Sequence, residues 1–148
     1  KEVTYLPAYG PEMRGGTANC SVIISEKEVA SPLCTVPDVL IAMNGPSFHK
    51  FAPRVKSGGI ILVNGSVSDC YAGRDDVRVC DLPANDLAIE AGDVRSANMV
   101  MLGAFCALTG AVKTRSILNC LNEKFVGKPG VVACNSRAFD AGFAAVKK

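Results

Sequence analysis

The segment Tyr9–Cys20, which reads Y-G-P-E-M-R-G-G-T-A-N-C, holds the residues of this chain that look best arranged for chemistry. Glu12 and Arg14 place a carboxylate and a guanidinium two residues apart. A proline before them stiffens the backbone. Gly15 and Gly16 can adopt positive φ or let another surface come close. The segment is therefore either a loop that holds two charges in one shape for binding, or a tight turn whose charges are solvated.

A second candidate site lies where predicted strands end. Asn44, Asn64 and Asp81 each follow a short apolar stretch. Because ligands bind beyond the carboxyl ends of parallel strands, we expect these residues to line one edge of a sheet, an edge that the Glu12/Arg14 loop could join. The alternative is local, because Asn-Gly pairs are good turn formers.

Residues for catalysis are not evident in the chain. The single histidine, His49, has no neighbouring Cys or Ser with which to form a nucleophilic pair, and a surface position is expected for it. Gly92-Asp93-Val94 is not the glycine–aspartate–glycine of a thiamine diphosphate site, and no G-x-G-x-x-G is present. The sequence predicts no catalytic residue in this chain.

The seven cysteines are spread along the sequence, at positions 20, 34, 70, 80, 106, 120 and 134. An odd number of scattered cysteines argues against a disulfide framework. None of them forms a C-x-x-C pair, the spacing typical of zinc sites and iron–sulfur clusters. We therefore expect reduced core cysteines, a cytoplasmic protein, and no metal bound by this chain.

Strand patterns come first in the sequence and helix patterns dominate its second half. The predicted strands are Val3–Leu6, Ser21–Ser25, Asp38–Ala42, Ile60–Val63 and Val77–Cys80, with a possible edge strand at Val29–Ser31. The predicted helices are Ser47–Val55, Asn85–Ala91, Ala97–Leu108, Thr114–Val126 and Asn135–Val146.

The stretch from Asp38 to Val63 has the order strand, helix, strand, which predicts a parallel pair joined by a crossover. The continuous apolar run Ile60–Val63 indicates a strand buried on both faces. The sequence therefore predicts an α/β fold, a three-layer α/β/α sandwich with a mostly parallel, Rossmann-like sheet. Residues 1–148 are expected to form a single domain.

Bulk composition limits the partners. Net charge is +2 with scattered basic residues, and there is no Trp, so nucleic-acid binding is not expected. The uncharged segment Ser96–Val112 is too short to span a membrane and predicts a buried helix. No targeting segment is visible at the start.

Five segments, taken in order, resemble the gamma subunit of the 2-oxoacid:ferredoxin oxidoreductases, most closely the 2-oxoglutarate type. They are Tyr9–Cys20, D-V-L-I-A-M-N-G-P-S from Asp38, G-G-I-I-L-V-N up to Asn64, L-P-A-N from Leu82, and N-M-V-M-L-G-A from Asn98. Members of this family begin with a strand and a G-x-G-G-Q-G turn that leads into a helix. This sequence starts after that point, so we expect either that segment or a neighbour to cover the apolar surface left open.

The resemblance implies an accessory role in CoA-dependent oxidative decarboxylation of a 2-oxoacid to acyl-CoA and CO2, with reduction of ferredoxin. It places thiamine diphosphate, Mg2+ and 4Fe–4S clusters in partner alpha, beta and ferredoxin-like delta subunits, and no cofactor in this chain alone. It implies that Arg14 meets a phosphate of CoA or a partner carboxylate, because its planar fork favours bidentate contacts. Glu12 would orient Arg14, and Gly15 and Gly16 would allow close approach.

The resemblance also implies that Asn44 and Asn64 belong to the same CoA or partner-subunit rim. Two alternatives remain open. The chain could be a stand-alone nucleotide- or CoA-binding module, with a homodimer as its form in isolation. It could also be the gamma subunit of a pyruvate, indolepyruvate or branched-chain 2-oxoacid complex.

Overall fold

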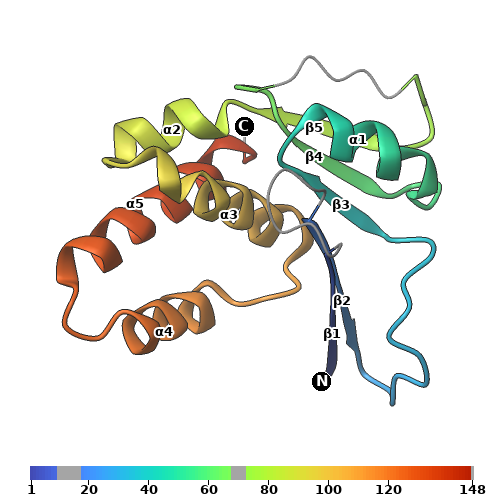
Figure 1. Ribbon diagram of the computed structural model, residues 1–148, viewed down its shortest axis with the longest axis horizontal. Coiled ribbons are helices and arrows are strands. Elements are labelled where there is room, and N and C mark those ends of the chain that lie inside the picture. The colour runs from blue at the N-terminus through green and yellow to red at the C-terminus, as the bar shows by residue number, and fades with distance from the viewer. Residues whose placement is uncertain (10–17, 68–72, 148) are drawn as a thin grey trace. The chain divides into compact units, whose positions relative to one another are not determined.

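The computed structural model describes residues 1–9, 18–67 and 73–147, and these form two compact units (Figure 1). The first unit is Lys1–Pro37 and the second is Asp38–Lys148. Each unit is internally hydrogen-bonded and is described here by itself. That the two act as a single domain stays a prediction.

The first unit is built on an antiparallel hairpin. Strand β1 (Glu2–Tyr9) pairs with β2 (Ala18–Ser25) along its whole length, from Glu2 opposite Ser25 to Tyr9 opposite Ala18. Both strands are longer than the sequence predicted. The prediction of an edge strand at Val29–Ser31 is wrong, because residues 26–37 contain no strand. A proline and a cluster of small polar residues there favour irregular backbone over pairing.

The sequence did not indicate which strands the first two would pair with. The hairpin is a sheet of its own, and neither β1 nor β2 pairs with the parallel strands of the second unit. The alternating exposure along β2, in which every second residue is exposed, is typical of an antiparallel strand rather than of a buried parallel one.

The second unit contains a three-stranded parallel sheet. Its strands are β3 (Val39–Ala42), β4 (Ile60–Asn64) and β5 (Arg78–Leu82), in the order β3-β4-β5. Val39 pairs with Ile60 and Ile60 with Arg78, so the three strands start in register. Between β3 and β4 the chain forms helix α1 (Gly45–Phe51) and a 3-10 turn, Ala52–Arg54. The parallel pairing predicted from the strand–helix–strand order is confirmed.

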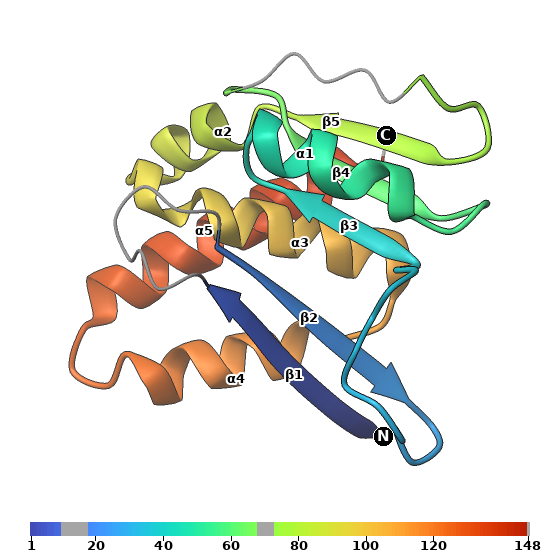
Figure 2. The ribbon, with the colours of Figure 1, turned by 45° about the vertical axis from the view of Figure 1, so that its right-hand side comes forward.

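Helices cover both faces of this sheet (Figure 2). On one face, Ile61 and Val63 of β4 pack with Phe48 of α1 and with Val55. On the other face, Leu62 packs into a larger core formed with α2 (Ala84–Ala91), α3 (Ala97–Thr109) and α5 (Pro129–Ala145). The second unit is thus the three-layer α/β/α sandwich that the sequence predicted.

The remaining helix limits differ from prediction mainly in α5. Helix α4 (Thr114–Lys124) and α3 begin where the sequence placed them. Helix α5 starts at Pro129, six residues before the predicted Asn135. Proline suits the first turn of a helix, where its missing N–H is not needed, and this start signal was missed because the apolar period is clear only further along. In the described part of the chain, no helix combines the length and apolar character needed to cross a membrane.

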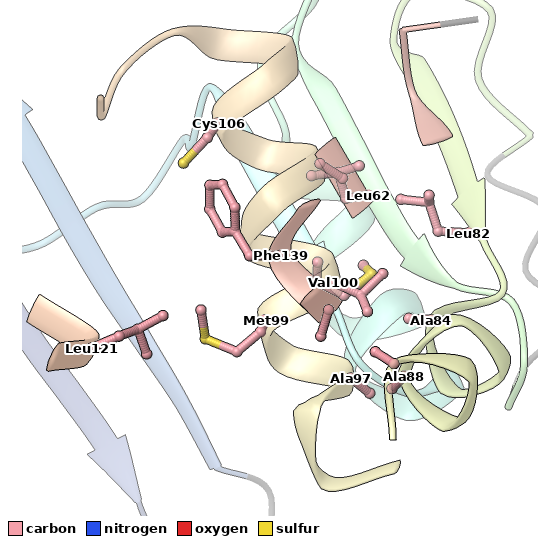
Figure 3. Packing of buried hydrophobic residues seen from close by; sticks show 14 residues of the cluster. Leu62, Leu82, Ala84, Ala88, Ala97, Met99, Val100, Cys106, Leu121 and Phe139 are labelled. Atoms are coloured by element: carbon pink, nitrogen blue, oxygen red, sulfur yellow. The ribbon is translucent and has the colours of Figure 1, made fainter. Parts of the chain in front are cut away.

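Helices α3 and α5 pack backbone to backbone. A Cβ added at Gly103 would clash with the carbonyl group of Phe139, and one added at Gly142 would clash with the carbonyl group of Val100. Figure 3 shows Phe139 and Val100 in the apolar core that this contact closes, together with Leu62 and Leu82 of the sheet. Two glycines, one on each helix, therefore set how closely the helices approach.

Adding a methyl group at this contact is expected to destabilise the protein. Gly103→Ala or Gly142→Ala should each lower the free energy of unfolding by about 1–3 kcal/mol, because the fixed backbone opposite cannot move away from the new Cβ. Gly130→Ala is the matched control, since it also lies in a helix but its Cβ would meet nothing within 4 Å. Urea denaturation of the three variants measures the difference. Equal stabilities for Gly103→Ala and Gly130→Ala would show that the helix contact is not tight.

Candidate functional site

The structure locates part of the predicted site. Asn44 and Asn64 both lie in the second unit, at the carboxyl ends of neighbouring parallel strands. Glu12, Arg14, Gly15 and Gly16 lie outside the residues that the structure describes, so their proposed roles stay predictions. Segment 10–17 connects Tyr9 to Ala18, the last hydrogen-bonded pair of the hairpin.

Asn44 is the N-cap of helix α1. Its backbone is extended, with φ −157° and ψ 163°, and its side-chain oxygen accepts a hydrogen bond from the Ser47 amide at 2.9 Å. The same asparagine ends the connection from β3 and starts the helix that covers one face of the sheet. This is the common role of asparagine at a helix start, and it fixes the side chain in an exposed position at the sheet edge.

Asn64 is the last residue of β4 and is buried, with 2% of its surface exposed. Its Nδ2 donates to Oδ1 of Asn85 at 3.0 Å, and its Oδ1 accepts from the Ser66 amide at 3.3 Å. A buried amide is costly unless it is hydrogen-bonded. Asn64 therefore joins the end of the central strand to the first turn of α2, which carries Asn85.

Two further contacts extend this network to the surface. Ser66 Oγ donates to Oδ2 of Asp86 at 2.9 Å and accepts from the Asn85 amide at 3.2 Å. We call Asn64, Ser66, Asn85 and Asp86 the edge cluster. They come from the end of β4, from the connection after it and from the start of α2, so the cluster joins the end of the central strand to α2 at the carboxyl edge of the sheet.

Asp81 lies beside the cluster, but not where the sequence placed it. It is the fourth residue of β5 rather than the residue after that strand. Its exposed carboxylate lies so close to Gly65 that a Cβ at that glycine would clash with it. Gly65 is thus required for the close approach between the β4 connection and the Asp81 side chain.

The charges at this edge favour ligand groups that donate hydrogen bonds or carry positive charge, and they disfavour phosphates. Asp81 and Asp86 bring two exposed carboxylates, while Asn64 and Asn85 are neutral and already paired with each other. Asp86 lies in the first turn of α2, where a negative charge also complements the helix dipole. The edge cluster offers hydrogen-bond acceptors, and a phosphate would need a cation from elsewhere in the chain or from a partner.

Sequence reasoning missed Ser66, Asn85 and Asp86 as site residues. The available signal was L-P-A-N, in which a proline ends β5 and a polar residue follows within one helical turn. What the sequence could not show is that the side chains of Asn64 and Asn85, 21 residues apart, meet. That contact depends on β4 and β5 being neighbouring strands whose carboxyl ends are level in the sheet.

The described residues offer no group of three or more His, Cys, Asp or Glu side chains that could hold a metal. The six described cysteines are free, and burial raises the pKa of the Cys106 thiol. The expectation that the cysteines lie in the core is wrong for Cys20 and Cys120, which are exposed. Cys20 lies on the exposed face of β2, and Cys120 lies at an exposed position of α4. His49 is exposed on α1, as predicted.

These features define the second unit as an α/β domain with a polar carboxyl edge suited to binding. The sequence of residues 1–145 matches the family described as pyruvate ferredoxin/flavodoxin oxidoreductase, and the chain belongs to this family. The resemblance drawn from the ordered motifs is thereby confirmed.

One curated relative is the ketoisovalerate oxidoreductase subunit VorA of Methanothermobacter thermautotrophicus, 41% identical over 96% of this chain. The chain spans 30% of the length of that relative. Another is the 2-oxoglutarate synthase subunit KorC of Methanocaldococcus jannaschii, 31% identical over 100% of this chain and 79% of its own length.

Two solved structures share the fold. The gamma subunit of a keto/oxoacid ferredoxin oxidoreductase from Geobacter sulfurreducens matches 97% of this chain and 79% of its own, with a TM-score of 0.76 and 29% identity. A 2-oxoglutarate:ferredoxin oxidoreductase from Magnetococcus marinus, described with 2-oxoglutarate, coenzyme A and succinyl-CoA bound, matches 98% of this chain and 26% of its own, with a TM-score of 0.85 and 27% identity.

The hydrogen bond between Asn64 and Asn85 should be energetically coupled. Asn64→Ala removes one partner and leaves buried polar groups unsatisfied, so we expect the free energy of unfolding to fall by about 1–3 kcal/mol. In the Asn64→Ala/Asn85→Ala double variant the two losses should be less than additive by about 1 kcal/mol. Chemical denaturation of the four proteins measures the cycle.

Asn122→Ala is the control for this cycle, because Asn122 is exposed and bonds only to the Leu118 carbonyl one turn earlier. It should change stability by less than about 0.5 kcal/mol. Strict additivity of the Asn64 and Asn85 effects would contradict the edge cluster as one unit.

Proposed function

We propose that this chain is the gamma part of a 2-oxoacid:ferredoxin oxidoreductase. The complex would oxidatively decarboxylate a 2-oxoacid in the presence of CoA, release acyl-CoA and CO2, and reduce ferredoxin. The observation that carries the proposal is the family match over residues 1–145, to which the gamma subunit from Geobacter sulfurreducens adds a fold match over nearly the whole chain.

In this proposal the chemistry is divided between subunits. Thiamine diphosphate, Mg2+ and 4Fe–4S clusters belong to alpha, beta and delta partners, and this chain supplies a binding surface. The cysteine spacing supports the division, because no two cysteines have the C-x-x-C spacing typical of iron–sulfur cluster ligands. The scattered free thiols also favour a cytoplasmic location, where thiols stay reduced.

The proposed contact surface for CoA or a partner subunit has two parts. One is the hairpin connection with Glu12, Arg14, Gly15 and Gly16. The other is the carboxyl edge, where Asn44 and the edge cluster lie. The carboxyl edge carries the carboxylates Asp81 and Asp86, which repel phosphates. We therefore assign the phosphate contacts to Arg14, and we expect the carboxyl edge to contact neutral or cationic groups of CoA or of a partner.

The substrate we propose is a branched-chain 2-oxoacid. The sequence motifs alone predicted 2-oxoglutarate. The observation against that choice is the 41% identity to a ketoisovalerate subunit, compared with 31% to a 2-oxoglutarate synthase subunit. 2-Oxoglutarate remains the second candidate, and a stand-alone CoA-binding module is the alternative without oxidoreductase activity.

A substrate series on the purified complex tests activity and substrate together. With CoA and ferredoxin present, kcat/KM should be highest for ketoisovalerate, by at least about tenfold over 2-oxoglutarate, pyruvate and indolepyruvate, because pocket fit separates these side chains by one or more kcal/mol. Acyl-CoA formation and ferredoxin reduction are the two readouts, and omission of CoA is the control. Ferredoxin reduction by this chain without partners would contradict the division of labour.

The role of Arg14 is tested in the same complex. Arg14→Ala should raise the KM for CoA by about tenfold or more, as expected for losing a charged hydrogen bond of roughly 1.5–3 kcal/mol, or should weaken subunit assembly. Arg14→Lys should retain only part of the wild-type CoA affinity or assembly, since it keeps the positive charge but not the planar, bidentate guanidinium. Arg115→Ala, on the exposed side of α4, is the control. An unchanged KM with intact assembly would show that Arg14 serves neither role.

A further inference from the structure

A second polar region of the second unit lies away from the edge cluster. It is a hollow of about 590 Å³ between the connection after α2, the first turn of α3 and the start of α5. Its charged and amide lining residues are Asp93, Arg95, Asn98, Lys128, Asn135 and Arg137. We call this region the basic hollow.

Positive charge is in excess in the basic hollow. Three cationic side chains, Arg95, Lys128 and Arg137, face one carboxylate, Asp93. Arg95 pairs with Asp93 at 2.6 Å, and the hydrogen bonds from Arg95 lower the pKa of the Asp93 carboxyl group. Lys128 and Arg137 therefore have no carboxylate of their own among the residues that line the hollow.

Arg137 is held in place by the end of α2. Its Nε and Nη2 donate to the Ala91 carbonyl at 3.0 and 2.8 Å. Gly92 follows with φ +120°, and a Cβ there would lie 3.2 Å from Arg137 Nη2. The guanidinium is thus fixed beside the hollow by two hydrogen bonds to a neutral group, and its positive charge remains uncompensated. A cationic side chain that is already fixed loses less conformational entropy on binding than a mobile one does.

The positive ends of two helices meet at the same place. Asn98 comes from the first turn of α3, and Lys128 and Gly130 lie at the start of α5. Ser96 Oγ lies 3.8 Å from Cys134 Sγ, so the start of α3 lies against the second turn of α5. Figures 1 and 2 show α3 and α5 starting on the same side of the second unit. Their dipoles add to the positive potential of the three side chains.

We propose that the basic hollow binds a small phosphate-bearing molecule. Phosphate carries the charge that balances Lys128 and Arg137, the two cations of the hollow without a carboxylate, and its oxygens can accept hydrogen bonds from both side chains. The volume lies within the range of about 300–1,000 Å³ found for small-molecule sites. The inference rests on residues 91–137 and does not require the proposed function.

Titration with inorganic pyrophosphate tests this site. Calorimetry on the full-length protein in its native assembly should show saturable binding. The Lys128→Gln/Arg137→Gln variant should lower that affinity by at least about tenfold, and Lys128→Gln alone should lower it less, because charge-assisted contacts are lost. Both side chains are exposed, so the fold should be retained, and the thermal unfolding midpoint checks this.

The control is Arg115→Gln/Lys124→Gln, which removes the same charge from exposed positions of α4 outside the hollow. It should leave pyrophosphate affinity within about twofold, since surface charges at a distance are screened by salt. Pyrophosphate bound by cofactor sites in partner subunits is the same in all variants and is subtracted. Absence of saturable binding, or equal weakening in both double variants, would overturn the proposal.

Competition with CoA separates two sources of the phosphate. Displacement of pyrophosphate by CoA would assign the hollow to the phosphates of CoA, and independent binding would assign it to a different phosphate-bearing ligand. Both outcomes support the site. Failure of this proposal can be told apart from failure of the proposed function. Pyrophosphate binding can be measured whether or not the complex has oxidoreductase activity, and oxidoreductase activity can be measured whether or not pyrophosphate binds.

Discussion

Strand β4 is covered on both faces, and this constraint shapes most of the second unit. Ile61, Leu62 and Val63 are each at most 1% exposed, and they alternate between the α1 side and the α3/α5 side of the sheet. A short parallel strand cannot bury both faces alone, so helices must be present on each side. The connections that deliver those helices leave the sheet at the carboxyl edge, and this is why polar residues gather there.

Burial of the central strand also decides what its last residue can do. Asn64 continues the buried strand and brings an amide into a region with little water. It is satisfied by Asn85 and by the Ser66 amide, so the cost of burial is offset locally. The buried part of the edge cluster therefore stabilises the fold, and the exposed carboxylate of Asp86 is accessible for binding. Binding at this edge would act on groups that also hold α2 against the sheet.

Charge is divided between two parts of the second unit. The carboxyl edge carries Asp81 and Asp86, whereas the basic hollow carries an excess of cations at the starts of α3 and α5. A binding domain with one acidic and one basic region can hold partners of opposite charge without moving either. This division suits a family in which a domain such as this one works beside other chains or other parts of a longer chain.

Motif order and local periodicity are properties of short stretches, so the sequence could predict the family, the parallel strand–helix–strand unit and the helical second half. It also placed Asn44 and Asn64 at one sheet edge, since both follow strands that had to be parallel. It did not say which partners the first two strands would have, because strand patterns do not specify pairing; the structure shows that β1 and β2 form a sheet of their own. The structure was also needed to show that Asn64 meets Asn85, that Asp81 lies over Gly65, and that Arg95, Lys128 and Arg137 surround one hollow. Those contacts join residues up to 46 positions apart, and they arise from how helices pack on the sheet rather than from any local pattern.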